Sequence, residues 1–395
     1  MKQPKNETLF TRNFVLTSLS TVAIFTSFYF LLVTLPRYIL DELHGSESEI
    51  GLIIGVFTIT AVLLRPFIGR EVDRRGRKVV LIAGLIVFLL SMLIYNYTRS
   101  VEELLMLRVL QGMGWGAATT AATTLIADVA PPSRRGEAMG VFGMSANVAM
   151  AVGPALSIIL LDASSYTTLF ITASAIALIS LLLALPISET AVMHPETPLF
   201  SREAFFPSAI MFTISLTYGS IVSFLPLFAT KQGITNPGIF FTVFAITLIL
   251  VRALAGRLSD IKGRKFVIVP GMIIIAFGLW VLSIAGSLTV FIAAAFLYGL
   301  GFGLFHPTMM ALLVDSVTPQ GRGAAMGTFT ASFDLGIGMG SILMGIMLQF
   351  AGASSMLKEL FGELAGFTAI YISGGLIVLI STILFIISYD KTRDE

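Results

Sequence analysis

Three ionisable residues lie well away from the ends of long apolar stretches in this 395-residue chain. They are Asp334 in ASFDLGIGMG, Arg108 in RVLQGMGWG and His306 in GLFHPT. A charged side chain at the centre of a bilayer costs roughly 2.5 to 3.5 kcal/mol on insertion scales, so such a residue is usually retained for a use. A carboxylate or an imidazole in such a place can take up and release a proton. The pattern favours proton transfer that is coupled to another process.

Each of the three residues also has a structural interpretation. Asp334 could make a hydrogen bond to a neighbouring helix, and His306 could be simply hydrogen-bonded within its span. Arg108 could extend to the outer surface or pair with Glu102 or Glu103.

The apolar stretches themselves define the class of protein. Hydrophobic residues make up 56% of the chain and charged residues only 12%, which excludes a water-soluble globule. About twelve stretches are long enough for a helix to cross the roughly 30 Å of hydrocarbon in a bilayer. We therefore expect an all-α membrane protein with twelve transmembrane helices. The predicted spans are 14–40, 48–69, 78–98, 103–128, 137–161, 166–187, 205–230, 238–258, 266–286, 289–315, 323–350 and 364–389.

Lysine and arginine are distributed unevenly between the two sides of these spans. With both termini on one side, 18 of the 25 basic residues fall on that side; four fall on the opposite side (Arg37, Arg99, Lys231, Lys358) and three within spans (Arg65, Arg108, Arg252). The richer side is cytoplasmic by the positive-inside rule. We thus predict a multi-pass protein of the cell (inner) membrane with both termini in the cytoplasm and a first span that is retained. The basic excess follows from this bias, so no nucleic-acid partner is expected. For Arg65 and Arg252, close to the cytoplasmic edge, we expect a structural role.

A charged segment occurs twice, as GREVDRRGRK from Gly69 and as GRLSDIKGRK from Gly256, 187 positions later. The same offset aligns the two copies without a gap from Gly51 to Gly153. Six spans per copy predict two parallel, pseudo-symmetric six-helix bundles with a transport site between them near the midplane. The predicted parts are residues 1–187, a cytoplasmic linker of residues 188–203, and residues 204–395.

The duplicated segments place acids beside basic residues at the cytoplasmic level. Carboxylates there can accept hydrogen bonds from backbone N–H groups or pair with the arginines, and the glycines permit a neighbouring helix to approach closely. Such a cluster could latch the cytoplasmic face in one state and release it in the other. The alternative is a solvated basic loop that only fixes topology. The predicted gating residues are Gly69, Asp73, Arg77, Asp128, Gly256, Asp260, Arg264 and Asp315.

The differences between the copies are equally informative. Arg108 aligns with Ala295, and Asp334 aligns with Asn147, so each of these two charges exists in one half only. A charge that is present in only one of two otherwise similar copies favours a specific function at that position.

These segments resemble the major facilitator superfamily, and within it the 12-helix drug or metabolite:proton antiporters. GREVDRRGRK is similar to the family's signature loop between helices 2 and 3, and RVLQGMGWG to a fourth-helix motif of proton-coupled members. Gly153-Pro154 resembles the core of the exporter motif, although Ala149, Ser157 and Ile158 stand where glycines are usual. The resemblance implies a part in proton coupling for Arg108. It also implies a gating role for Gly69, Asp73, Arg77 and Asp128.

Helices 1, 4, 7 and 10 line the central cavity in this family, which implies a set of substrate contacts. Aromatic side chains among them can stack on a flat or amphipathic molecule. Exporters of cationic drugs commonly carry an acid in helix 1, and the first span here has none before its outer end. A neutral, zwitterionic or anionic substrate therefore fits at least as well as a cationic one. The candidate cavity residues are Tyr29, Gln111, Trp115, Asn147, Tyr218 and Tyr298.

We expect a secondary transporter that works by alternating access and exports a small amphipathic drug or metabolite in exchange for protons. Asp334, Arg108 and His306 are the predicted proton-coupling residues. Proton-coupled or facilitated uptake of a nutrient is the alternative within transport; a lipid scramblase or a membrane-embedded enzyme is an alternative of another class. The sequence contains no Walker motif, metal-ligand cluster or nucleophile motif, so it predicts no enzyme, cofactor or metal. The expected partners are a small-molecule substrate, protons and the lipid bilayer, with the protein as a monomer.

Overall fold

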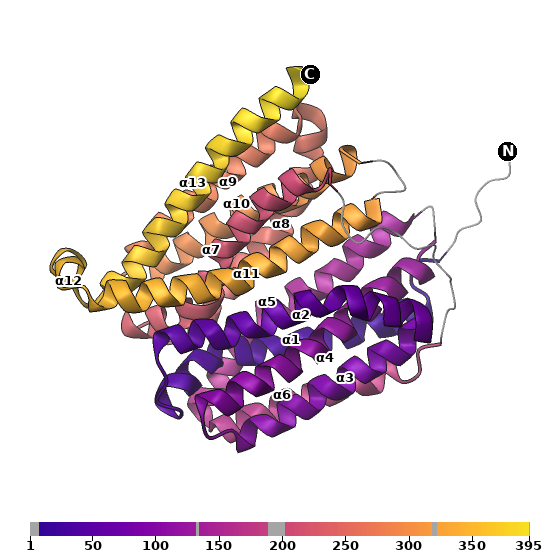
Figure 1. Ribbon diagram of the computed structural model, residues 1–395, viewed down its shortest axis with the longest axis horizontal. Helices are drawn as coiled ribbons and strands as arrows, with labels where there is room; N and C mark the ends of the chain where they lie inside the picture. Colours follow the sequence, from indigo (N-terminus) through magenta and orange to yellow (C-terminus); the bar gives the residue numbers. More distant parts are fainter. Residues whose placement is uncertain (1–7, 132–133, 189–201, 318–321, 395) are drawn as a thin grey trace.

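The computed structural model describes residues 8–131, 134–188, 202–317 and 322–394, and within these ranges it is built from helices without a β-strand (Figure 1). The helices are α1 (Arg12–Asp41), α2 (Glu47–Arg75), α3 (Arg77–Ile94), α4 (Val101–Val129), α5 (Arg135–Ala163), α6 (Tyr166–Ala184), α7 (Phe205–Lys231), α8 (Gly238–Lys262), α9 (Arg264–Ser283), α10 (Leu288–Asp315), α11 (Arg322–Ala353), α12 (Ser355–Phe361) and α13 (Ala365–Asp394), with 3-10 turns η1 (Tyr95–Tyr97) and η3 (Gly362–Leu364).

Most of these helices are long and apolar enough to cross a membrane. Among the described residues ten helices qualify, and an eleventh is added if the two parts of α8, which meet at 42°, count as one span. The prediction of an all-helical membrane protein is confirmed. The remaining predicted span, α4, is less apolar because it carries Arg108 and a run of small and polar residues from Gly112 to Thr124. It is shielded by its neighbours, since it packs between α2 and α3.

The helices form two groups that follow the order of the chain. Figure 1 shows α1 to α6 in the lower part of the molecule and α7 to α13 in the upper part. Within the first group α1 packs on α5 and α6, and α4 packs on α2 and α3; within the second, α10 packs on α8 and α9, and α11 on α7. Contacts between the groups come mainly from α2 with α11 and from α5 with α8. This is the predicted fold of two six-helix bundles, while most of the predicted linker lies outside the described residues.

Glycines in equivalent positions hold equivalent helix pairs together. A Cβ atom added to Gly114 of α4 would lie 2.6 Å from the backbone nitrogen of Phe88 on α3. A Cβ atom on its repeat mate, Gly301 of α10, would lie 2.6 Å from the carbonyl oxygen of Gly271 on α9. Only a hydrogen side chain permits these approaches, so the GMGWG and GLGFG segments serve helix packing.

The two groups are tightly joined at the end of the molecule that carries the loops at Gly45 and Gly233, called the far end below. Between α2 and α11, a Cβ atom on Gly55 would lie 2.6 Å from the carbonyl oxygen of Gly338. Between α5 and α8, the Thr242 hydroxyl donates to the carbonyl oxygen of Ala151 at 2.5 Å. Lys231 on α7 and Glu47 on α2 add an ion pair at 3.6 Å. Backbone contact and an ion pair therefore close this end.

The same four helices have more room at the other end, called the basic end, which carries the duplicated loops. Gly69 of α2, Gly143 of α5, Gly256 of α8 and Gly327 of α11 have no described atom within 4 Å of an added Cβ. The prediction that Gly69 and Gly256 permit close helix approach is therefore wrong for this conformation. Their helices also continue beyond them, to Arg75 and Lys262.

Two other glycines end these helices. Gly76 and Gly263 have φ values of 96° and 89°, a region that residues with a side chain rarely adopt. Each glycine turns the chain directly from one helix into the next, so the arginine that follows, Arg77 or Arg264, begins α3 or α9.

Candidate transport cavity and gates

A cavity of about 280 Å³ lies between the two groups of helices. The first group contributes side chains from α1, α2, α4 and α5, and the second contributes side chains from α7, α8, α10 and α11. Most of the wall is aromatic or aliphatic. Its polar residues are Tyr29, Thr58, Asn147, Tyr218, Arg252, His306 and Asp334.

An ion pair joins the two groups at this cavity. Arg65 Nη2 of α2 lies 2.6 Å from Asp334 Oδ2 of α11, and their side chains are 24% and 20% exposed. Asp334 lies in the cavity wall. The expectation that Arg65 is only structural needs correction, because it supplies the opposite charge to this acid from the other half of the molecule.

Arg252 and His306 lie in the same wall but differ from Asp334 in their surroundings. The described residues provide no ion pair and no hydrogen bond to either side chain. The His306 ring packs instead against aromatic rings, at 5.5 Å from Phe302 and 5.9 Å from Phe333 between centroids. His306 is therefore an aromatic-packed wall residue that keeps its ring nitrogens available.

Four of the six predicted cavity residues line the cavity: Tyr29, Trp115, Asn147 and Tyr218. Trp115 packs against Phe25 and Phe28, with both centroid distances at 4.6 Å. The Asn147 Nδ2 group is buried and has no hydrogen-bond partner among the described residues. The cavity thus combines an aromatic surface with an unused hydrogen-bond donor.

The other two predicted cavity residues, Gln111 and Tyr298, are not among those that line it. Both are buried by packing within their own bundle. The Gln111 side-chain oxygen accepts hydrogen bonds from the Tyr95 hydroxyl and from Arg108, both at 2.7 Å. The Tyr298 hydroxyl lies 3.3 Å from the Thr217 hydroxyl. Their helices were correctly assigned, but these side chains do not line the cavity.

Arg108 is buried inside the first bundle, with 1% of its surface exposed. Its Nε donates to the carbonyl oxygen of Ile53 at 3.2 Å, its Nη1 donates to Gln111, and its guanidinium lies 4.2 Å from the centre of the Phe57 ring. It neither reaches the surface nor forms an ion pair with Glu102 or Glu103 among the described residues. Arg108 thereby ties α4 to the part of α2 that packs on α11.

Among the predicted gating residues, an arginine and an aspartate pair in the same way in each half at the basic end. Arg77 Nε lies 2.7 Å from Asp128 Oδ2, and Arg264 Nε lies 2.9 Å from Asp315 Oδ2. Arg264 also contacts Asp260 at 2.6 Å. The side chain of Asp73, the repeat mate of Asp260, lies outside the described residues. The duplicated sequence has therefore produced a duplicated ion pair, in which one arginine at the start of α3 or α9 holds the end of α4 or α10.

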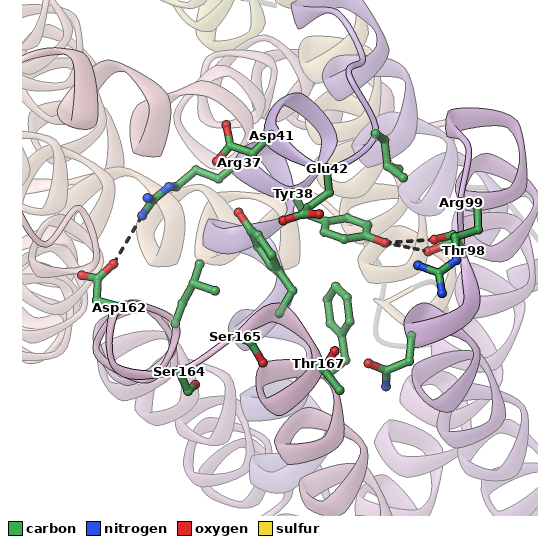
Figure 2. Close-up of a pocket in the computed structure, with 15 residues that line it drawn as sticks. Arg37, Tyr38, Asp41, Glu42, Thr98, Arg99, Asp162, Ser164, Ser165 and Thr167 are labelled. Atoms are coloured by element: carbon green, nitrogen blue, oxygen red, sulfur yellow. Dashed lines mark hydrogen bonds and ion pairs between the residues drawn. The ribbon is translucent and has the colours of Figure 1, made fainter.

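A second, more polar cavity of about 570 Å³ lies at the far end (Figure 2). Its wall comes from α1, α5, α6 and the segment before α4, all in the first bundle. Figure 2 shows Arg37 and Asp162 paired across it at 3.5 Å, and the Tyr38 hydroxyl donating to the carbonyl oxygen of Thr98 at 3.1 Å. Sequence reasoning missed this cavity, because it used Arg37 only as one of the basic residues that define the topology. A cavity within one bundle cannot alternate its access between the two sides, so it is not the candidate transport site.

Two helical bundles that enclose a cavity between them define a membrane transporter. The Major Facilitator Superfamily model matches residues 17–240 and again 208–395, and the chain belongs to this family. It is accordingly a multi-pass membrane transporter for small molecules and not an enzyme.

Relatives and solved structures agree with this assignment. The chain is 27% identical to the uncharacterized MFS-type transporter MJ1560 of Methanocaldococcus jannaschii, covering 80% of this chain and 86% of the relative. It is 24% identical to the staphylopine export protein of Staphylococcus aureus, covering 87% and 88% of the two chains. A solved bacterial homologue of the human lysosomal transporter Spinster has a TM-score of 0.80 at 16% identity, covering 95% of this chain and 96% of that one. This likeness shows the shared fold.

Proposed function

We propose that the protein exports a small amphipathic molecule in exchange for protons, with Asp334 as the group that carries the proton. The observation that supports this most strongly is the ion pair between Asp334 and Arg65, because it lies at the cavity and joins the two bundles. A proton on Asp334 would remove the charge on one side of this contact. Protonation would then be linked to the relative position of the bundles.

The proposed cycle uses the topology inferred from the basic residues, in which the basic end faces the cytoplasm. In the present conformation the far end is closed and Asp334 contacts Arg65, an arrangement that favours the carboxylate form. The substrate enters from the cytoplasm in this state. The bundles, residues 1–187 and 204–395 joined by the linker, then rock to open the far end, where the substrate leaves and Asp334 takes up a proton. Return of the protonated form releases that proton inside.

The other predicted proton-coupling residues have supporting parts in this proposal. Arg108 fixes the backbone of α2 at Ile53, close to the contact of α2 with α11. It would therefore hold α2 in the position that lets it pack on α11 at the far end. His306 would serve as a polar wall residue beside Asp334. The pairs Arg77–Asp128 and Arg264–Asp315 would brace the basic end of each bundle.

The direction of transport draws on the names of relatives. One is the staphylopine export protein, and the multidrug resistance protein 2 of Bacillus subtilis is 27% identical over 81% of this chain. Both names describe removal of a compound from the cell or resistance to it, which favours export over uptake of a nutrient.

The test is a set of inside-out vesicles that hold an acidic interior and a pH-sensitive dye. A panel of amphipathic compounds is added to wild-type vesicles and to vesicles with Asp334→Asn, with Glu363→Gln as an exposed-acid control. We expect at least one compound to accumulate in wild-type vesicles and to dissipate the gradient, and Asp334→Asn to abolish both effects. Undiminished gradient-driven accumulation in Asp334→Asn would overturn the role of this acid. Accumulation only when the exterior of the vesicles is the acidic side would indicate that proton and substrate move in the same direction, and would replace export with proton-coupled uptake.

A further inference from the structure

The pseudo-symmetry of the bundles relates the Arg65–Asp334 pair to a second pair of residues in the same cavity. At the offset of 187 positions, Arg65 corresponds to Arg252, and Asn147 corresponds to Asp334. The helices correspond as well, because α2 packs on α11 as α5 packs on α8. Arg252 and Asn147 thus occupy the positions in the other pair of helices that correspond to Arg65 and Asp334. Both residues line the cavity.

In this second place the carboxylate is missing. Asparagine has the shape of aspartate but no charge, and the Asn147 Nδ2 group is buried without a hydrogen-bond partner. Arg252 has no ion pair and no hydrogen bond among the described residues. The contrast with other arginines within the spans is clear, since Arg65 has Asp334 and Arg108 has Gln111 and the Ile53 carbonyl. Two donors therefore face the same cavity without an acceptor.

A guanidinium inside a membrane protein is costly unless an opposite charge or an acceptor accompanies it. Its planar donor groups match a carboxylate or a phosphate in a bidentate arrangement. Among the residues that the structure describes, Asp334 is the only acid that lines the cavity, and it already contacts Arg65. Arg252 in the wall and the Arg65–Asp334 pair together leave one positive charge in excess and no free carboxylate for a cationic ligand among the described residues.

We propose that Arg252 and Asn147 bind an acidic group of the transported molecule, which supplies the carboxylate that the second half lacks. This inference rests on the proposed transport function and specifies its substrate as a small organic anion. The aromatic residues Phe302 and Phe333 next to His306 provide an apolar surface for the rest of the molecule. The cavity volume of about 280 Å³ is close to the lower limit of ligand pockets, which suits a small molecule with one ring and a short acidic chain.

The fluorescence of Trp115 provides a direct test, because this side chain lies in the cavity wall. The chain has two tryptophans, and Trp280 does not line the cavity, so Trp280→Phe leaves a single reporter. The probes are 4-phenylbutyrate, its neutral amide and 4-phenylbutylamine, which share a phenyl chain and differ in charge. They are titrated into the purified protein in detergent to millimolar concentration.

We expect saturable binding of 4-phenylbutyrate and at least about tenfold weaker binding of the amide and the amine, as loss of a charge-assisted contact implies. Arg252→Gln should weaken carboxylate binding by a similar factor. Asn147→Asp should do the same for a different reason, since it gives Arg252 a partner within the protein. Arg257→Gln, an exposed arginine on the same helix, is the matched control and should bind like the parent. Unchanged thermal unfolding of each variant identifies those that remain folded.

The results separate this inference from the proposed function. Equal binding of the amine or the amide, no saturable binding of 4-phenylbutyrate, or full carboxylate binding by folded Asn147→Asp would overturn the anion site. Gradient-coupled accumulation of other compounds in the vesicles would then still support transport. Selective carboxylate binding without any gradient response would instead support the anion site and reject the proton-coupled cycle.

Discussion

Arg77 Nε lies 2.7 Å from Asp128 Oδ2, and the two side chains are only 3% and 2% exposed. The equivalent pair in the second half, Arg264 and Asp315, has side chains that are 21% and 55% exposed. The same sequence element has therefore produced one buried and one solvated contact.

This difference predicts unequal effects of the matched substitutions Asp128→Asn and Asp315→Asn. Removal of one partner from a buried ion pair typically costs about 3 to 5 kcal/mol, because the other charge is left buried. An exposed pair is worth about 0 to 1 kcal/mol. We expect a large fall in the apparent Tm of the purified protein for Asp128→Asn and a small one for Asp315→Asn. Similar falls would mean that burial in this conformation does not govern the two contacts.

The Arg65–Asp334 pair predicts a non-additive pattern of stability. Arg65→Gln and Asp334→Asn each leave one partly buried charge without its partner, while the double variant leaves none. We expect the double variant to be more stable than the sum of the single effects predicts, by about 0.5 to 3 kcal/mol, a usual range for residues in contact. Thermal unfolding of the four proteins measures this coupling. Additive effects would show that the pair contributes no stability in the state that predominates in detergent.

The far-end contact between α2 and α11 predicts sensitivity to a single methyl group. Gly55→Ala would place a Cβ atom 2.6 Å from the Gly338 carbonyl oxygen, so the helices must separate. The native chain has no cysteine, so Ser341→Cys, buried in this contact, can report the change. We expect faster labelling of this cysteine by a membrane-impermeant maleimide in the Gly55→Ala background.

Gly352→Ala is the control for that experiment. It lies on α11 near the same end, but an added Cβ would have no atom within 4 Å. Its labelling rate should equal that of the Ser341→Cys protein alone. If Gly55→Ala also leaves the rate unchanged, the backbone contact is not what closes the far end.

The surroundings of Arg108 predict that lysine cannot replace it. The guanidinium reaches the Ile53 carbonyl and Gln111 while lying over the Phe57 ring, and one ammonium group cannot maintain this arrangement. We expect Arg108→Lys to lower stability by about 1 to 3 kcal/mol, as loss of buried hydrogen bonds to a charged group does. Arg99, which is exposed just before the start of α4, provides the control. Arg99→Lys should change stability by less than about 0.5 kcal/mol. Equal apparent Tm values for the two variants would contradict the contacts described for Arg108.

The sequence was most informative where the repeat or the helical pattern fixes local contacts. The arginine–aspartate pairs at the basic end were predicted because each contact joins elements that are neighbours in both copies. Asp334 was identified because an acid in an apolar span is costly. These inferences need only the offset of 187 positions and the helix period.

Contacts between the halves could not be predicted in this way. Arg65 and Asp334 lie on helices whose facing depends on how two bundles meet, and neither helical period nor repeat offset contains that information. Gln111 and Tyr298 lie on correctly predicted helices, each one helical turn before a residue that lines the cavity, Trp115 or Phe302. How far the cavity extends along these helices is set by the packing of the two bundles. The predicted span 48–69 ends at Gly69, but Glu71 and Arg75 form an ion pair four residues apart and α2 continues to Arg75.

The polar cavity at the far end has walls from the first bundle only (Figure 2). When two bundles rock as rigid bodies, such a cavity keeps the same shape in every state. A molecule bound there would have no preference between the states, and by thermodynamic linkage a ligand without preference cannot shift their populations. Occupancy of this cavity would leave the transport equilibrium unchanged, which makes it a site for attaching a reporter rather than one for controlling the transporter.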